Sequence, residues 1–534
     1  MIEKLQTLWP EITLFIGACV VMIVGLSGSA QLRRLCWPIS AAALIAAGLL
    51  AYTTNHPSAH ALPNIAQYGK VLTAFVGLLL IFVLAGTADR QYEADIERGA
   101  LRFDPLRATR GEFYALFLFS LMGLMLCCGA DDLIWLFLAL ELVSLPTYIM
   151  VAISTSRNRS MEAGIKYFFL GAMGAATFLY GFALIYGATG VTGLAEIKGV
   201  FAQQMASPGG INALGIVGMI LAIVGISFKI AAVPMHFYTP DVYQGASAPV
   251  SAFLAFVPKT AGFVSILLLT TTLAWIPSAD YPAGTLPPSI HTVLWIMAVL
   301  TMTVGNTLAL LQTSIKRILA YSSIAHSGYM LVGVIVGPGA RPGEFSSSGI
   351  AAVLFYLLVY GVMNLGAFAV VASLQRPGKD GTMEEVDQLD DIRGLCINRP
   401  VLGWTMVICA ASMLGLPPLL GFFGKLPLFT AGMGAGHYTL VIIMGINSAI
   451  GAVYYLRLAG YPLLEQPDLS GSAAQVRPVH VNGRWIAGLL SAAGVILLVI
   501  YPMTGPALFG AKYTPQLEPQ IRPGSIQAVP VAKH

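Results

Sequence analysis

The feature that most constrains this chain is a set of ionisable residues inside segments that otherwise have the composition of membrane-spanning helices. They are Glu141, Lys166, Lys229, Lys259 and Lys425. On insertion scales, an ionisable side chain at mid-bilayer depth costs about 2.5 to 3.5 kcal/mol. Five of them facing lipid would cost on the order of 15 kcal/mol, more than the net stability of a typical domain. We therefore expect these side chains to face one another or water inside the protein, as they do in proteins that move charge.

The composition is typical of a polytopic membrane protein, because 57% of the 534 residues are hydrophobic and only 10% are charged. Soluble globular chains carry about 25% charged residues. Apolar runs long enough to cross about 30 Å of hydrocarbon predict an all-α fold with about fourteen transmembrane helices. These runs lie at about residues 9–27, 35–54, 70–88, 112–130, 133–153, 163–189, 211–233, 248–275, 290–311, 318–336, 348–374, 401–432, 437–460 and 484–504.

Loop charges predict the orientation of these helices. Most loop arginines and lysines follow odd-numbered spans, so the positive-inside rule places both termini outside. This pattern fits a multi-pass protein of the bacterial plasma (inner) membrane with periplasmic termini. The pair Lys316-Arg317 is expected to anchor the inner interface, and residues 89–111 and 375–400 form longer inside loops. The proline-rich tail 505–534 is expected to be irregular and to lie on the outer surface.

The sequence lacks the residues that several classes of function require. The net charge of +4 is too small to indicate a nucleic-acid partner. The six cysteines form no CxxC motif and no Cys/His cluster, so they are expected to be small buried hydrophobes and not metal or iron–sulfur ligands. No glycine-rich nucleotide-binding loop follows a strand. We therefore predict no cofactor and no metal site in this chain.

Two of the predicted spans are interrupted by proline close to a buried lysine. Lys229 precedes Pro234 in span seven, and Lys425 follows Pro417-Pro418 in span twelve. Proline breaks a helix, and broken backbone inside a bilayer is tolerated only where it is buried in protein or lines a wet cavity. Paired interrupted helices in the two halves of a transporter indicate its ion path.

The two interrupted spans are five apart, and an odd offset inverts the topology. Spans 4–8 and 9–13 could therefore be inverted five-helix repeats, although coincidence is an alternative because proline is common in membrane helices. The chain would then divide into an N-terminal three-helix segment with its loop (1–111), a first repeat (112–275), a second repeat (290–460) and a last span with loop and tail (461–534).

Glu141 and Lys166 are predicted to form an ion pair. They lie 25 residues apart across one short inside loop, which places them at similar depth on adjacent antiparallel helices if span six begins near Arg157. A static structural salt bridge is the alternative to a functional pair.

Five runs of sequence resemble subunit N of bacterial NADH-quinone oxidoreductase, or respiratory complex I, and its mitochondrial and chloroplast counterparts. The runs are LFLALELVSLPTYIMVA (137–153), EAGIKYFFLGA (162–172), FKIAAVPMHFYTPDVYQGASAPVSAFLAFVPKTAGF (228–263), SIKRILAYSSIAHSGYMLVG (314–333) and LPPLLGFFGK (416–425). The resemblance is colinear over about residues 70–460. It implies a proton-translocating subunit with two inverted repeats and discontinuous helices seven and twelve. The long third loop and the extended tail depart from the family pattern.

Carried over residue by residue, the resemblance implies a proton path through the family's glutamate on helix five and its lysines on helices six, seven, eight and twelve. These match Glu141, Lys166, Lys229, Lys259 and Lys425. His236 matches the family's histidine at the helix-seven break. It is a relay candidate together with His326, because histidine titrates near neutrality. For His326, a buried hydrogen-bonded core histidine is an equal alternative.

A mechanism follows as a hypothesis. Burial disfavours the ammonium form of a lysine, and a nearby carboxylate favours it, so movement of a carboxylate can change proton affinity. Glu141 with Lys166 would act as the switch, and a proton held on Lys229 would pass laterally through Lys259 to Lys425 and the exit side.

The energy must come from partner subunits, since the chain has no redox centre. The resemblance implies NADH, flavin, iron–sulfur clusters and quinone in a peripheral redox arm, and antiporter-like and small membrane subunits as neighbours in the lipid bilayer. The enzyme would be an NADH:quinone oxidoreductase of the proton-translocating translocase type. Alternatives are a subunit of a multi-subunit cation/proton antiporter or hydrogenase-type membrane complex, and a structural scaffold with inert charges.

Overall fold

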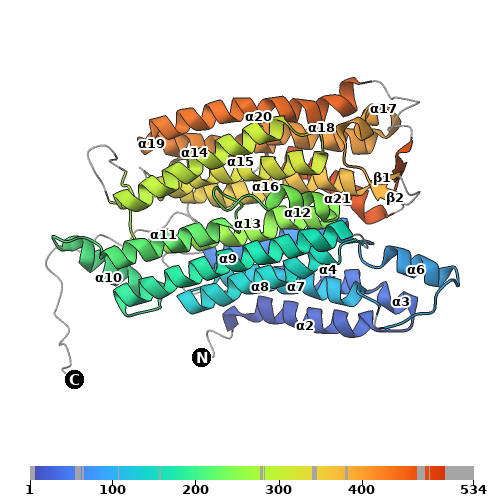
Figure 1. Cartoon of the computed structure of the whole chain (residues 1–534), viewed down its shortest axis with the longest axis horizontal. Helices are drawn as coiled ribbons and strands as arrows, with labels where there is room; N and C mark the ends of the chain where they lie inside the picture. The colour runs from blue at the N-terminus through green and yellow to red at the C-terminus, as the bar shows by residue number, and fades with distance from the viewer. Residues whose placement is uncertain are drawn as a thin grey trace.

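The computed structural model describes most of the chain, and almost all of the described part is helical (Figure 1). The described residues are 6–54, 62, 65–105, 107–155, 158–276, 281, 283–339, 345–378, 383–465, 475–479 and 481–499. The tail 505–534 and both chain ends therefore lie outside the described residues.

The helices follow the predicted apolar runs closely. Their bounds are α2 (Trp9–Gly25), α3 (Ala30–Arg33), α4 (Cys36–Thr53), α5 (Ile65–Leu84), α6 (Arg90–Glu97), α7 (Arg110–Cys128), α8 (Leu133–Ala152), α9 (Asn158–Thr189), α10 (Leu194–Ala206), α11 (Ala213–Ser227), α12 (Thr239–Gly245), α13 (Ala248–Thr271), α14 (Pro288–Leu310), α15 (Ile315–Val336), α16 (Gly349–Ala372), α17 (Leu395–Asn398), α18 (Pro400–Leu414), α19 (Leu420–Gly434), α20 (Tyr438–Leu464) and α21 (Asn482–Leu497). Two 3₁₀ turns, η1 (Phe345–Ser347) and η2 (Leu389–Ile392), precede α16 and α17. Helix α10 lies in a loop for which no helix was predicted.

Among the described residues, ten helices are long and apolar enough to cross a membrane, or eleven if the bent pair Leu389–Asn398 and Pro400–Leu414 is one span. Three further apolar helices are shorter, namely α2, α11 and α21. The chain is therefore a multi-pass helical membrane protein, as its composition predicts.

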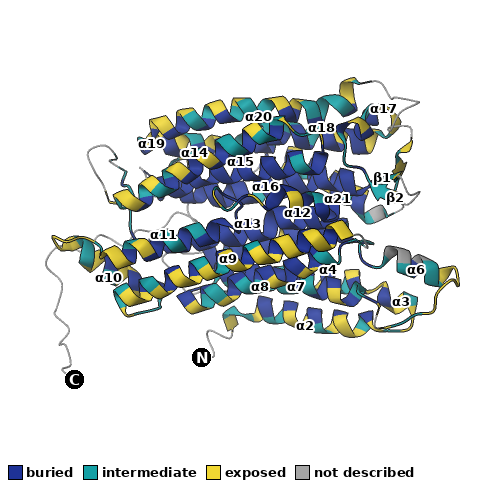
Figure 2. Ribbon diagram, viewed as in Figure 1, coloured by how far each residue is buried: buried dark blue, intermediate teal, exposed yellow. Residues whose placement is uncertain are grey.

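Three helices form the centre of the bundle. The membrane-length windows of α13 and α15 are buried along their whole length, and that of α16 is 94% buried (Figure 2). A helix that is apolar on every side can be buried on every side. By contrast, the corresponding window of α9 is only 33% buried, so this helix lies at the periphery and exposes an apolar face. Polar side chains within these windows of α13 and α15 are therefore surrounded by other protein groups.

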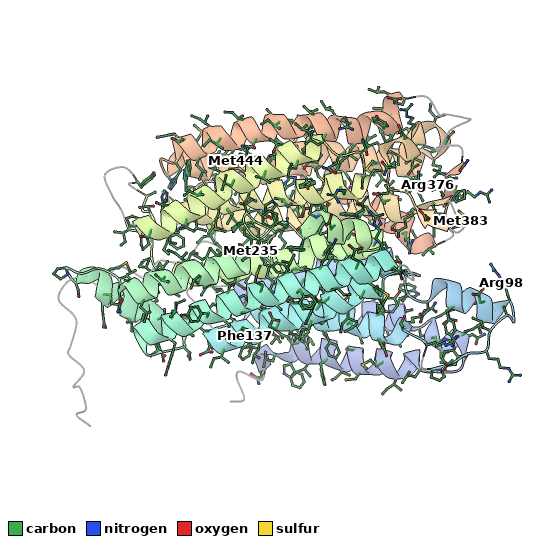
Figure 3. All side chains as sticks on the ribbon, viewed as in Figure 1. Arg98, Phe137, Met235, Arg376, Met383 and Met444 are labelled. Atoms are coloured by element: carbon green, nitrogen blue, oxygen red, sulfur yellow. The ribbon has the colours of Figure 1, made fainter. Side chains whose placement is uncertain are left out.

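Short elements and charged side chains gather at one end of the helices. The helices α3, α6 and α17 lie there with a small antiparallel sheet in the order β2-β1-β3, formed by β1 (Leu374–Pro377), β2 (Met383–Glu385) and β3 (Arg477–Pro478). Gln375 of β1 pairs with Glu385 and with Arg477. The labelled side chains Arg98 and Arg376 lie at this end (Figure 3). Several of the arginine-bearing loops that were predicted to share one side thus lie together.

Both predicted interruptions are present. Residues 228–238 separate α11 from α12, and residues 415–419 separate α18 from α19. Each break contains a cis X–Pro bond, Val233–Pro234 in the first and Pro417–Pro418 in the second. Met235, in the first break, lies near the middle of the molecule (Figure 3). Neighbouring helices cover both breaks only in part, because Pro234 and Phe237 in the first and residues 416–418 in the second are exposed.

Candidate functional site

Lys229 lies at the start of the first break and forms an ion pair with Glu141 of α8. Lys229 Nζ is 3.3 Å from Glu141 Oε1, and it also donates to Ser144 Oγ. Only 1% of the Lys229 side chain and 21% of the Glu141 side chain are exposed. Ser144 in turn donates to the carbonyl of Leu140 at 2.7 Å, which leaves its oxygen free to accept from the lysine. The buried ammonium thus has one charged and one neutral acceptor.

Local sequence features place the two partners. Asp132 caps α8 by accepting from the backbone N–H groups of Ile134 and Trp135, and so fixes the start of the helix that carries Glu141. On the other side, Gly262 of α13 packs directly on the first break. A Cβ at this position would lie 3.0 Å from Lys229 Cβ and 2.6 Å from Ile230 Cγ2. The missing side chain therefore lets α13 approach the backbone around Lys229.

Lys259 lies one turn before Gly262 on α13 and reaches across to α15. Its Nζ donates to the Ser323 carbonyl and, at 2.6 Å, to Ser323 Oγ. The same Nζ lies 4.8 Å from the centre of the Tyr360 ring, an arrangement that favours a cation. Lys259 is 2% exposed. No carboxylate accepts from it among the described residues, so this ammonium would be surrounded by neutral groups only.

His326 continues the polar groups along α15, one turn after Ser323. Its Nδ1 is 2.5 Å from the Tyr356 hydroxyl, and its Nε2 is 2.7 Å from the Tyr455 hydroxyl. The ring is fully buried and lies 5.1 Å, centre to centre, from Tyr360. Both ring nitrogens therefore have partners, which fits the alternative of a satisfied core histidine as well as a relay.

Lys425 lies on α19 and turns back to the end of α18. Its Nζ donates to the carbonyls of Met413 and Leu414 at 3.0 and 2.9 Å, and lies 3.3 Å from Ser448 Oγ. These carbonyls belong to the last turn of α18, where an α-helix leaves acceptors unsatisfied and carries partial negative charge. The Lys425 ammonium also lies 5.3 Å from the centre of the Tyr329 ring.

The structure thus brings four of the predicted residues and His326 into one row. The row starts at Glu141 and Lys229, passes Lys259 and His326, and ends at Lys425. In Figure 1, α8 lies in the lower half of the molecule, α13 in the middle and α15, α20 and α19 in the upper half, so the row crosses the helix axes.

Sequence reasoning missed the neutral members of this row. They are Ser144, Ser323, Tyr356, Ser448 and Tyr455. Two of them could have been found from helical periodicity. Ser144 follows Glu141 by three positions and Ser323 precedes His326 by three, so each shares a helix face with a predicted residue.

The predicted pairing of Glu141 with Lys166 is wrong in this structure. Helix α9 does begin near Arg157 as that pairing required, but Lys166 forms its ion pairs with Glu162 at 2.6 Å and with Asp241 at 3.6 Å. Its side chain is 46% exposed. The spacing argument fixed depth along the helix but not the direction of the side chain, and the buried partner of Glu141 is Lys229 instead.

His236 lies in the first break, seven residues after Lys229. It is 7% exposed, and its ring packs on Phe237 with centres 4.3 Å apart. Within the described part of the chain, no hydrogen bond or ion pair joins His236 to a lysine of the row. The described residues also contain no group of three or more His, Cys, Asp or Glu that could hold a metal ion.

Two interrupted helices and a row of buried lysines across a helical bundle define an antiporter-like membrane protein. Residues 130–451 match the family described as NADH:quinone oxidoreductase/Mrp antiporter, TM. The chain belongs to this family. It is 37% identical to NADH-quinone oxidoreductase subunit N of Trichlorobacter lovleyi over 93% of this chain and 95% of that protein. It is 35% identical to NADH-quinone oxidoreductase subunit N 1 of Rhizobium meliloti over 92% of this chain and 96% of that protein. The resemblance in sequence is thereby confirmed.

Solved structures agree with this assignment. A chain of respiratory complex I from Thermus thermophilus, determined with bound aureothin, matches with a TM-score of 0.71 and 29% identity, over 94% of this chain and all of that one. A chain of the Mrp complex from a Dietzia species matches with a TM-score of 0.70 at 18% identity, over 96% of this chain and 97% of that one. The second likeness shows the shared fold alone.

Proposed function

We propose that this chain is the subunit-N-type, proton-translocating membrane subunit of a redox-driven NADH:quinone oxidoreductase. The observation that carries the proposal is the row of buried ionisable groups from Glu141 to Lys425, which crosses the centre of the bundle. Relatives over nearly the full length of the chain are NADH-quinone oxidoreductase subunits N. An inert scaffold would have no use for ammonium groups that burial makes costly.

Protons would move between four clusters of polar groups, each held by its own short contacts, around Lys229, Lys259, His326 and Lys425. In this arrangement the Glu141 carboxylate would stabilise the protonated form of Lys229. A shift of either side chain would weaken this contact, and Lys229 would release its proton. The proton would then pass to Lys259 beside Ser323, along the hydroxyl and imidazole groups around His326, and to Lys425. Lys166, which pairs with Glu162 and Asp241, would then act as a charge at the α9 surface and not as the partner of Glu141.

The proposed function includes a specific arrangement of membrane spans. The ten long helices, the bent pair and the three shorter apolar helices would together make the fourteen spans. The two breaks, each beside a row lysine, support inverted repeats over 112–275 and 290–460. The arginine-bearing end would face the cytoplasm of a bacterium, with both termini in the periplasm.

Energy would arrive from other subunits, since the row can bind and pass protons but cannot transfer electrons. NADH, flavin, iron–sulfur clusters and quinone would be held by the peripheral arm and its neighbours. Antiporter-like and small membrane subunits would surround this chain in the bilayer. Coupling would act by changing the arrangement of Glu141 and Lys229.

The test is Lys229→Met in the whole complex, in membrane vesicles. We expect assembly on a native gel and NADH oxidation by an artificial acceptor to be unchanged, while protons moved per NADH oxidised fall. Lys198→Met, an exposed lysine of α10, is the matched control and should pump normally. Normal proton yield in the assembled Lys229→Met complex would overturn the proposal.

A further inference from the structure

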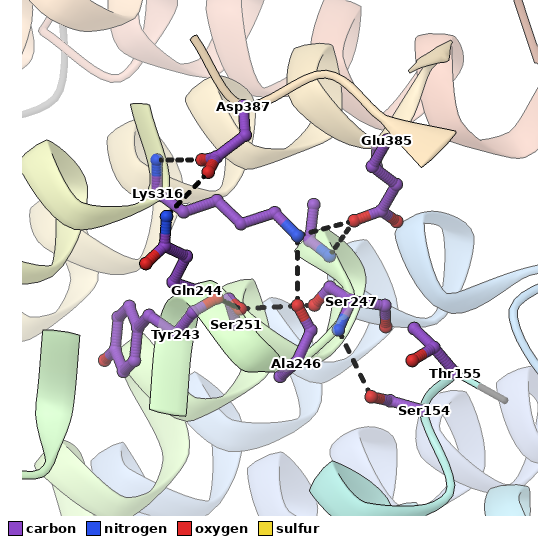
Figure 4. A network of polar contacts seen from close by, with 12 residues as sticks. Ser154, Thr155, Tyr243, Gln244, Ala246, Ser247, Ser251, Lys316, Glu385 and Asp387 are labelled. Carbon is purple, nitrogen blue, oxygen red and sulfur yellow. Dashed lines mark hydrogen bonds and ion pairs between the residues drawn. The ribbon is translucent and has the colours of Figure 1, made fainter. Parts of the chain in front are cut away.

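A polar cluster joins α12, α13 and α15 at the end of the bundle where the small sheet lies (Figure 4). Glu385 Oε2 accepts from Lys316 Nζ at 2.7 Å and from the backbone N–H of Ala248 at 2.8 Å. Asp387 accepts from Ser314 Oγ at 2.6 Å and from Gln244 Nε2 at 2.9 Å. We call the side chains Gln244, Lys316, Glu385 and Asp387 the latch.

The two carboxylates of the latch lie at helix starts. Ala248 is the first residue of α13, and Ser314 is the N-cap of α15. Negative charge is favourable at these positions, because the first N–H groups of a helix are unsatisfied and carry partial positive charge. The backbone adds to this contact, since Ile315 N–H donates to the Asp387 carbonyl at 2.5 Å. The segment 385–388 is therefore held firmly against both helices.

Lys316 connects this segment to the end of α12. Besides Glu385, its Nζ donates to the Ala246 carbonyl at 3.0 Å, directly after α12. Its side chain is only 7% exposed. The expectation that Lys316 anchors the inner interface is therefore wrong for this residue, because its charge is used inside the protein. Its neighbour Arg317 donates to Asp241 of α12 at 2.8 Å.

Helix α15 also contacts the proton row further along its length. Ser323 accepts from Lys259, and Ser327 Oγ donates to the Ile230 carbonyl at 2.5 Å, one residue after Lys229. The first break is thus held to α15 at two places, by Ser327 near Lys229 and by the latch beyond α12. A change in the latch would alter how the break lies against α15.

We propose that Lys316 and Glu385 are positioning residues, which set the spacing between the Lys229 site and the Lys259–Ser323 site by fixing α12 and the start of α13 on α15. This inference rests on the proposed proton path. It assigns a function to the segment 385–388, which lies outside the row. Through this segment, the second half of the chain would determine how the first break is positioned.

The test uses Glu385→Gln in the whole complex, with assembly, NADH oxidation by an artificial acceptor and protons moved per NADH as readouts. Mutations in such a contact network change coupling measurably. We therefore expect the proton yield to fall by about two-fold. If Lys229→Met itself lowers the yield by less than this, Glu385→Gln should cause most of that smaller loss. Electron transfer to the artificial acceptor should stay normal. The control is Asp390→Asn, an exposed carboxylate of the same segment that pairs only locally with Arg393.

Two further variants separate positioning from simple loss of structure. Lys316→Arg, which keeps the positive charge and the donors to Glu385 and the Ala246 carbonyl, should recover part of the proton yield that Lys316→Met loses. If Glu385→Gln does not assemble, Gln244→Leu provides the same test, because it removes the α12 contacts with Asp387 and Arg317 and leaves Glu385 and Lys316 in place. Wild-type proton yield in an assembled latch variant would overturn the inference. If Lys229→Met lowers the yield in the same preparation, only the latch is refuted, and if it does not, the proposed function itself fails.

Discussion

The two breaks hold their lysines in different ways. Lys229, at the first break, faces a carboxylate, whereas Lys425, at the second, faces two backbone carbonyls and a serine. An ammonium beside a carboxylate is part of a neutral pair, and one among neutral oxygens carries an uncompensated charge in a low-dielectric interior. In the proposed path, the first site would therefore keep its proton until Glu141 moves, and the second would take up a proton and give it away. Matched breaks need not be equivalent sites.

The strongest test of this difference is the stability of Lys229→Met. The variant leaves Glu141 in place without its partner, and breaking a buried pair in this way costs about 3–5 kcal/mol. We expect a clear fall in the melting temperature of the purified complex in detergent. The double variant Lys229→Met with Glu141→Gln should recover much of it, because the orphaned charge is then removed. Equal melting temperatures for the single and double variants would contradict the pairing.

A second ion pair, away from the row, shows what a purely structural pair does. Glu93 of α6 lies 2.7 and 2.8 Å from two guanidinium nitrogens of the fully buried Arg33, and Arg110 is 3.5 Å away. We expect Glu93→Gln to destabilise the complex by about 1.5–3 kcal/mol, less than Lys229→Met, because the amide oxygen can still accept from Arg33, which also donates to the Ser27 carbonyl. Proton yield per NADH in the surviving complex should stay normal, unlike that of Lys229→Met.

The ion pair of Glu93 with Arg33 also predicts how the stability of the protein depends on pH. Burial alone would raise the pKa of Glu93, but the hydrogen bonds and charges of Arg33 and Arg110 outweigh it and lower the pKa below its usual 4.5. A carboxyl whose folded pKa is lowered stabilises the protein above its unfolded pKa, and this contribution is lost as pH falls through the folded value. The difference in melting temperature between the wild type and Glu93→Gln should therefore be constant near neutral pH and shrink below about pH 4.5. A difference that grows on acidification would contradict this sign.

At the second break, Lys425→Met should have a smaller effect on stability. It leaves the Met413 and Leu414 carbonyls without their lysine donor but strands no charge, so we expect about 1–2 kcal/mol. Melting temperatures measured beside those of Lys229→Met give the comparison directly. Proton yield should nevertheless fall, because the exit side of the row is lost. A larger destabilisation than that of Lys229→Met would reverse the assignment of the two sites.

These residues show which parts of the fold and the site can be predicted from the sequence. Lysines and a glutamate inside apolar runs indicate a buried charged path, and proline near Lys229 and Lys425 predicts where the helices break, because both arguments use only local chemistry. The partner of Glu141 could not be predicted, since it depends on which way the backbone turns after α11 and not on spacing along α8 and α9. The roles of Ser323 and Lys316 were hidden for a similar reason, as each is defined by a contact with a distant segment. Local physics thus predicts the members of the site, and packing decides how they pair.

The smallest expected effect concerns the link between the two breaks. Ser323 gives Lys259 a hydroxyl and a carbonyl, and Ser323→Ala removes only the hydroxyl, so the lost hydrogen bond should cost about 1 kcal/mol. Stability should hardly change, but the rate of proton transfer should fall, because the lysine loses the hydroxyl that it contacts on α15, the helix that carries His326. Pumping rate per complex is the readout, and Ser323→Thr is the control, since it keeps the hydroxyl. If alanine and threonine pump equally well, the hydroxyl is not part of the path, and the two breaks are linked through the Tyr360 side of Lys259 instead.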